Sequence, residues 1–181
     1  MAFTPTEHRL GGPSTFAQID SAANYTSNSS TAATNNWWPI GTILRGVDGT
    51  LGGGEFIYLQ GVASNAAGLV VSYNATTGAV VLLPSTANLG TPVAVSMSAN
   101  TSAANYSWYQ IEGLSTVLKS AVAVTPQAKV YISGTTGRLM PTSASGKQII
   151  GAKYANLATV TSTTSTATIL LSRPWAQGQI T

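Results

Sequence analysis

The chain has 181 residues, of which 44% are hydrophobic and only 7% are charged, and its formal net charge is +3. An average soluble domain carries about 25% charged residues, so we expect neutral polar groups or partner chains to cover most of this surface. The absence of cysteine excludes disulfides, iron–sulfur clusters and thiolate zinc sites, and the eight Lys and Arg residues are spread too singly to predict nucleic-acid binding.

Residues 1–45 are predicted to form an extended arm, because they are rich in Gly, Pro, Ser and Asn and lack sustained alternation of apolar and polar residues. Only residues 14–25 suggest a short helix, with Ser14 as its N-cap and with Phe16 and Ile19 three apart. The arm has no apolar run of the secretory type, and no later run approaches the roughly 20 apolar residues that cross a bilayer. We therefore expect a protein that is soluble when made and has no membrane partner.

Two adjacent tryptophans, Trp37 and Trp38, end the arm before Pro39. One interpretation is that the arm folds back and these rings fill the core of their own domain. The other is that they insert into a neighbouring protein, because tryptophan is enriched among interface anchors. Both interpretations are consistent with the sequence.

From about residue 46, short runs rich in Val, Ile, Thr and Tyr alternate with turn residues, which is typical of a small β-sandwich or β-barrel. The predicted strands are Glu55–Leu59, Leu69–Tyr73, Ala79–Leu83, Pro92–Ser98, Trp108–Glu112, Ser115–Leu118, Lys129–Ser133, Gln148–Ala155 and Thr166–Leu171. The sequence thus predicts an all-β domain over residues 46–181, preceded by the extended arm.

One pattern occurs twice in this domain. "VVSYNATTGAVVLLP" at 70–84 is matched by "KVYISGTTGRLMP" at 129–141, and "TPVAVSM" at 91–97 by "QIIGAKY" at 148–154. The shared glycine of each "TTG" lets two strands reverse tightly, so each copy predicts a β-hairpin followed by further strands. We predict two related repeats, about 55–113 and about 115–171, that close against each other in one core, followed by a tail at 172–181.

The sequence offers little for catalysis. No motif pairs its five carboxylates, which belong to Glu7, Asp20, Asp48, Glu55 and Glu112. Its single histidine, His8, lies in the arm. A Ser-His-Asp relay would have to be built from that arm, and a histidine metal site needs a second ligand. "LGGGEF" at 51–56 and "SASGKQ" at 143–148 lack the spacing of phosphate-binding loops and read as turns. We predict no catalytic residues, no metal site and no cofactor.

Three aromatic residues, Tyr106, Trp108 and Tyr109, suggest a second hypothesis. On a strand, Tyr106 and Trp108 share a face, and an exposed aromatic platform of this kind stacks on sugar rings in carbohydrate-binding modules. The alternative is that Trp108 belongs to the core while the tyrosines pack at an edge or an interface.

The second half of the chain resembles the capsid decoration, or cement, proteins of tailed bacteriophages. The segments that carry the likeness are "SAVAVTP", "KVYISGTTGRL", "QIIGAKY" and "ATILL", in that order. The resemblance covers roughly residues 52–171, and the first copy follows it less closely. The chain departs from the family at "TPQAK" (125–129), where members often place a Gly-Asp turn, and its arm is longer than a minimal cement protein needs.

The resemblance implies a non-enzymatic structural protein of the virion, made in the host cytoplasm. It implies binding to the outer capsid surface, commonly as a homotrimer, where such a protein holds adjacent major capsid proteins together. We expect the arm to lie along the major capsid protein through Phe3, Phe16, Trp37 and Trp38. The alternative is a carbohydrate- or receptor-binding β module on a virion surface, which requires an exposed Tyr106, Trp108 or Tyr109.

Overall fold

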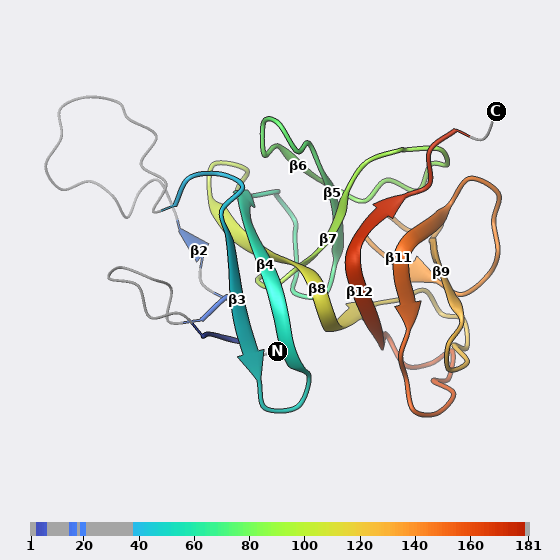
Figure 1. Cartoon of the computed structure of the whole chain (residues 1–181). Coiled ribbons are helices and arrows are strands. Elements are labelled where there is room, and N and C mark those ends of the chain that lie inside the picture. Colours follow the sequence, from blue (N-terminus) through green and yellow to red (C-terminus); the bar gives the residue numbers. More distant parts are fainter. Residues whose placement is uncertain (1–2, 7–14, 18, 21–37, 180–181) are drawn as a thin grey trace, which may run out of the picture.

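The structure is a computed structural model that describes residues 3–6, 15–17, 19–20 and 38–179 (Figure 1). Every regular element in these ranges is a β-strand, so the predicted all-β class is confirmed, and no described segment is a helix long and apolar enough to cross a bilayer. The strands are β1 (Thr4–Pro5), β2 (Ile19–Asp20), β3 (Ile43–Asp48), β4 (Gly52–Gln60), β5 (Val70–Tyr73), β6 (Val80–Leu82), β7 (Val93–Ser96), β8 (Tyr106–Leu118), β9 (Lys129–Ile132), β10 (Leu139–Met140), β11 (Gln148–Tyr154) and β12 (Thr166–Ala176).

All strand pairs are antiparallel and belong to one branched sheet, which is not closed into a barrel. Its main path runs β1-β3-β4-β8-β12-β11-β9-β10, while β2 and the β6-β5-β7 branch attach to β8. The strands predicted at 108–112 and 115–118 form a single strand, β8, because Gly113 adopts a φ of 93° that lets the strand continue through a bend. The predicted tail also begins too early, since β12 continues to Ala176.

The described residues of the arm contact the sheet. Phe16 and Ala17 form a turn, and Ile19–Asp20 pair with the start of β8 instead of continuing the predicted helix. The remaining residues of that prediction, Ser14 and 21–25, lie outside the described residues. Tertiary packing overrides the weak helical signal here, because Phe16 is fully buried against the sheet.

The two copies have the same strand pairing. In the first copy β5 pairs with β6 and β7, and β7 pairs with β8. In the second copy β9 pairs with β10 and β11, and β11 pairs with β12. The hairpin turns match as well: Asn74 N donates to Ala79 O at 2.9 Å, and Ser133 N donates to Arg138 O at 3.1 Å. β4, the first strand of the first copy, pairs with β8, and β8 in turn pairs with β12, the last strand of the second copy. β8 therefore ends the first copy and begins the second (Figure 1).

The copies also share a core. One face of β5 and β7, formed by Val70, Val93 and Val95, packs in the same cluster as Val130 and Ile169 of the second copy. The opposite face of these strands packs on Ile57 and Leu59 of β4 in a separate cluster. The β5–β7 layer is therefore buried on both sides, which explains why β7 is an unbroken run of buried residues.

Candidate functional site

The two phenylalanines of the arm, Phe3 and Phe16, are buried against the chain's own sheet. Phe16 stacks on Phe56 of β4 with ring centroids 4.0 Å apart, and Phe3 contacts the same ring at 5.0 Å. Phe3 is 1% exposed and Phe16 0%. Gly46 of β3 makes room for them, because a Cβ there would lie 2.4 Å from Phe16 Cε2. Two of the expected anchors, Phe3 and Phe16, are thus core residues in this structure, because they pack against one face of β4.

Trp38 is half-buried and meets the edge of Trp108 at a centroid distance of 6.1 Å. This position matches the interpretation in which the arm folds back onto its own domain. Trp37 lies outside the described residues.

The expected sugar-binding platform is not exposed. Trp108 and Tyr109 are buried on opposite faces of β8, Trp108 beneath the arm and Tyr109 against Ile57. Tyr106 alone keeps part of its surface, and it stacks on Tyr58 at 5.9 Å. The hydroxyl of Tyr109 donates to Gln60 O at 3.2 Å, and burial raises its pKa. The three residues therefore belong to the packing of β4 and β8, which removes the geometric basis of the glycan hypothesis.

Four charged side chains from four strands form one network, which we call the charge network: Arg45, Glu55, Glu112 and Arg173. Glu55 lies at its centre, with Oε2 accepting from Arg173 Nη2 at 2.8 Å and Oε1 accepting from Arg45 Nε at 3.2 Å. Glu112 Oε2 lies 3.8 Å from Arg173 Nε. These contacts, above all the hydrogen bond from Arg173, lower the pKa of Glu55. Glu55 is thus an ionised partner of two arginines.

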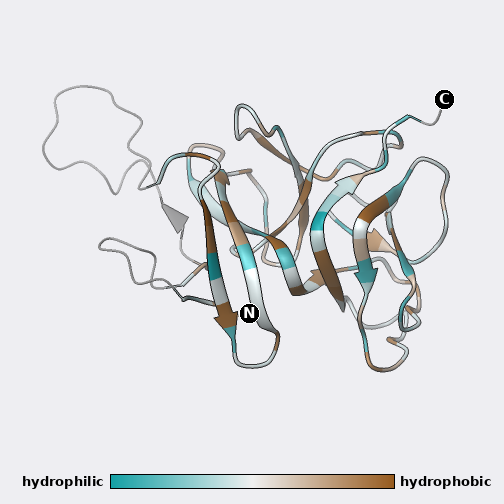
Figure 2. Ribbon diagram, in the orientation of Figure 1, coloured by the Kyte–Doolittle hydropathy of each residue, from teal (hydrophilic) through white to brown (hydrophobic). Residues whose placement is uncertain are grey.

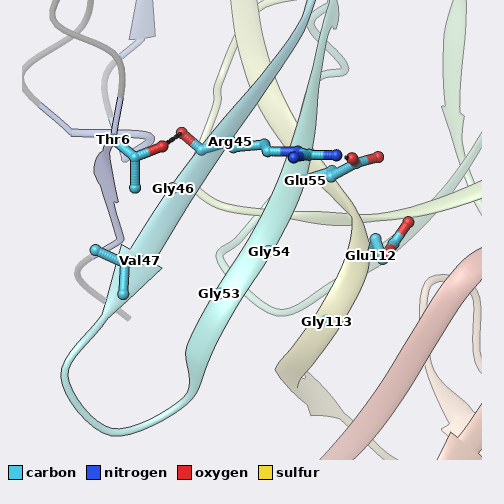
Figure 3. A pocket seen from close by; sticks show the side chains of 9 residues that line it. All are labelled: Thr6, Arg45, Gly46, Val47, Gly53, Gly54, Glu55, Glu112 and Gly113. Carbon is cyan, nitrogen blue, oxygen red and sulfur yellow. Dashed lines mark hydrogen bonds and ion pairs between the residues drawn. The ribbon is translucent and has the colours of Figure 1, made fainter.

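A groove of about 410 Å³ opens beside this network (Figure 3). Gly46, Gly54 and Gly113 line it and stand directly opposite one another on β3, β4 and β8. Val47 borders one side, and the charge network borders the other. Gly53 also lines the groove, and a Cβ there would meet nothing within 4 Å. This open space at Gly53 lets another backbone approach closely, so the groove suits an extended peptide segment.

This groove was not predicted from the sequence. "LGGGEF" is predicted to form a turn, whereas residues 52–54 belong to β4 and pair with β3. The signal was the set of glycines itself, since glycine in a strand marks a bulge or the close approach of another backbone. The register that aligns Gly46 and Gly113 with them was not predictable from spacing.

Lys119, directly after β8, is buried at 1% exposure and meets no carboxylate among the described residues. Its Nζ donates to three backbone carbonyls, those of Val122 at 2.9 Å, Thr161 at 3.0 Å and Ser120 at 3.2 Å. An ammonium has three donors, so all of them are used, although burial lowers the pKa of the group. The side chain fastens two loops together and is not presented to a substrate.

Large hydrophobic side chains stand exposed elsewhere on the sheet and its loops: Ile40, Ile43, Val47, Val81, Val122, Ile150, Leu157, Leu170 and Trp175. Two of them form a direct cross-strand pair, Ile150 of β11 with Trp175 of β12, at 56% and 49% exposure. Exposed tryptophan beside an aliphatic residue is characteristic of protein interfaces.

The described residues thus define an all-β protein with a glycine-lined groove and an exposed apolar pair. None of their acidic, histidine or cysteine side chains gather in a group of three or more that could hold a metal ion. A scan against protein-family models finds no match, and a search of curated proteins finds no similar sequence.

Proposed function

We propose that this chain is a non-enzymatic structural protein of a virus particle, a capsid decoration protein of a tailed phage. In this role it binds the outer surface of the head and clamps adjacent major capsid proteins, with copies of itself as a homotrimer. The observation that carries the proposal is the exposed Ile150–Trp175 pair, a binding surface on a chain with very little charge.

Two further features support a binding role. The carboxylates Glu55 and Glu112 face each other across β4 and β8 and both contact Arg173, which is the arrangement of an ion-pair network that joins strands. The groove runs along the glycines of β3, β4 and β8 beside the charge network, so an extended protein segment can lie in it and meet charged side chains. Both features favour contacts with protein chains over a chemical reaction.

The arm has a different part in this proposal from the one the sequence suggested. Phe3 and Phe16 are buried against β4, so in this proposal they stabilise the domain and do not anchor it to the shell. Contact with the major capsid protein is instead assigned to the exposed sheet surfaces. Trp38, which is half-buried, contributes to the inner packing through Trp108.

The test is binding of the purified chain to heads of the encoding virus that lack it, measured by co-sedimentation and by electron microscopy. We expect saturable binding, with density repeated at symmetric positions of the outer shell. Trp175→Ser should weaken the binding, whereas Val81→Ser, an equally exposed change on β6, should not. A wild-type chain that remains in the supernatant with intact heads refutes the proposal.

A further inference from the structure

The charges of the chain are distributed very unequally. Residues 113–181 contain six Lys and Arg residues and no Asp or Glu, whereas residues 1–112 contain all five carboxylates and only Arg9 and Arg45 as cations. The positive charge of the chain is therefore concentrated in residues 113–181, although the net charge is only +3. A surface of one sign attracts a partner of the other sign and steers its approach.

Three of these six cations are occupied within the chain. Lys119 is buried, and its Nζ donates to three backbone carbonyls. Arg138 Nη1 donates to Lys119 O at 3.0 Å, and Arg173 belongs to the charge network. Lys129, Lys147 and Lys153 make no ion pair with the described carboxylates. These three are therefore the cations with charge to offer to a partner.

Two of the three are placed side by side. Lys129 of β9 and Lys153 of β11 stand directly opposite each other in the sheet, and both side chains are exposed. Like charges in this position destabilise a sheet, so the pair does not serve the fold. An arrangement that costs stability without an internal partner points to a partner outside the chain.

The pair borders the exposed apolar surface. Lys153 is also opposite Leu170 of β12, and the next exposed pair along the same two strands is Ile150 with Trp175. We call this surface the lysine face: Lys129, Ile150, Lys153, Leu170 and Trp175. It spans β9, β11 and β12, which lie side by side in Figure 1, and Figure 2 shows hydrophobic and hydrophilic segments along β11 and β12.

We propose that the lysine face docks an acidic protein surface, in which Asp or Glu side chains surround an apolar ridge. This inference rests on the proposed function, and the partner is then a patch of the capsid shell. The apolar side chains supply affinity by burial, and the two lysines orient the encounter and raise its rate.

The carboxylates that the structure describes do not suit a second chain to this face. These carboxylates are already engaged, because Glu55 and Glu112 are held by arginines and Asp48 accepts from Thr50 N and Leu51 N at 2.8 and 2.9 Å. A nucleic acid does not fit it either. Ile150, Leu170 and Trp175 occupy most of the surface, and two lysines neutralise only two phosphates.

The test compares two single charge reversals in the full chain. Lys153→Glu changes the lysine face, and Lys147→Glu makes the same charge change in the loop before β11. Binding to heads that lack the protein is measured at low and at high salt, and the oligomeric state of each variant is measured in parallel by light scattering. Duplex DNA is the third probe.

We expect Lys153→Glu to weaken head binding about tenfold at low salt, and the difference from wild type to shrink at high salt. Lys147→Glu should bind within about twofold of wild type, because it lies off the face. Both variants should keep the wild-type oligomeric state, and Lys153→Glu should raise the melting temperature slightly, because it replaces the like-charge pair with Lys129 by an opposite-charge pair.

Other results overturn the inference in distinguishable ways. Equal binding by Lys153→Glu and wild type refutes the lysine face alone, and so does an equal loss in both variants. Loss of the oligomer in Lys153→Glu shows that a second copy occupies the face, and tight binding to duplex DNA shows a nucleic acid. Failure of the wild-type chain to bind heads refutes the proposed function, and this docking with it.

Discussion

Glu55 lies at the centre of the charge network. Its carboxylate, on β4, accepts a hydrogen bond from Arg45 on the neighbouring strand β3. It accepts another from Arg173 on β12, which lies on the far side of β8. Its side chain is only 12% exposed, whereas those of the two arginines are 74% and 60% exposed. The least accessible member of the network is thus the one that accepts two hydrogen bonds from arginines.

This geometry makes stability dependent on pH in the acid range. Because the pKa of Glu55 is lowered from 4.5 in the folded chain, its ionised form stabilises the fold above that value. The contribution is lost as pH falls below 4.5 toward the folded-state pKa. We expect Glu55→Gln to lower the midpoint of urea unfolding at pH 7 and to have a smaller effect at pH 3. Glu112→Gln, which removes only the 3.8 Å contact, should have the smaller effect at pH 7, and the reverse order would contradict this account.

Lys119 gives a second prediction at this scale. Lys119→Met keeps the length of the side chain but leaves the carbonyls of Ser120, Val122 and Thr161 without their donor. Hydrogen bonds to a charged group are worth about 1.5–3 kcal/mol, so we expect a loss of that order in the free energy of unfolding. Lys129→Met, on an exposed lysine, should change it by less than about 0.5 kcal/mol, as measured by urea denaturation. Equal effects would show that the carbonyl contacts contribute nothing.

Individual residues were the least predictable level from sequence. The burial of Phe16 depends on Gly46, which lies thirty positions away and faces it only once β1 and β3 have paired. The buried Lys119 carries no local signal either, since its acceptors come from two different loops. The absence of carboxylates after Glu112, in contrast, is readable from the sequence directly.

At the scale of elements, β8 has the most demanding position. It pairs with β4 over Tyr106–Gly113 and with β12 over Glu112–Leu118, so its partner changes near Gly113. Gly113 has a φ of 93°, and a Cβ there would lie 2.3 Å from Gly53 O. The change of partner thus needs a residue without a side chain.

Two glycines in the groove test this requirement. Gly113→Ala forces a left-handed backbone on an L residue and a contact with Gly53 O, so we expect it to lower the free energy of unfolding by about 2 kcal/mol or more. Gly53→Ala should be neutral or stabilising by up to about 1 kcal/mol, because its φ is not positive and the added methyl meets nothing within 4 Å. Thermal and urea unfolding of both variants provide the measurement. A Gly113→Ala protein as stable as Gly53→Ala would contradict the account.

Strands were more predictable than single contacts. Alternation and turn residues located β4–β7, β9, β11 and β12, because these segments bury at least one apolar face. The merging of two predicted strands into β8, and the pairing of β1 and β2 from the arm, were missed. Both depend on long-range partners, and two-residue strands have no periodicity to detect.

At the scale of the whole molecule, the duplication produces one folding unit, not two. The copies share β8, and Val95 of the first copy packs at 0% exposure in the cluster that holds most of the second copy's core. A loss of packing at Val95 must therefore destabilise both copies together. Two copies with separate cores would instead unfold independently.

Val95→Ala tests this coupling with Val81→Ala, exposed at 54% on β6, as the control. Removing two buried methyl groups should lower the free energy of unfolding by about 2 kcal/mol in a single transition, with equal calorimetric and van't Hoff enthalpies. Amide exchange should accelerate in β11 and β12 as much as in β7, because their slowest amides open only when the shared core unfolds. Val81→Ala should leave all of these rates near wild type. Unchanged exchange in β11 and β12 of the Val95→Ala protein, or a second transition, would show that each copy folds on its own.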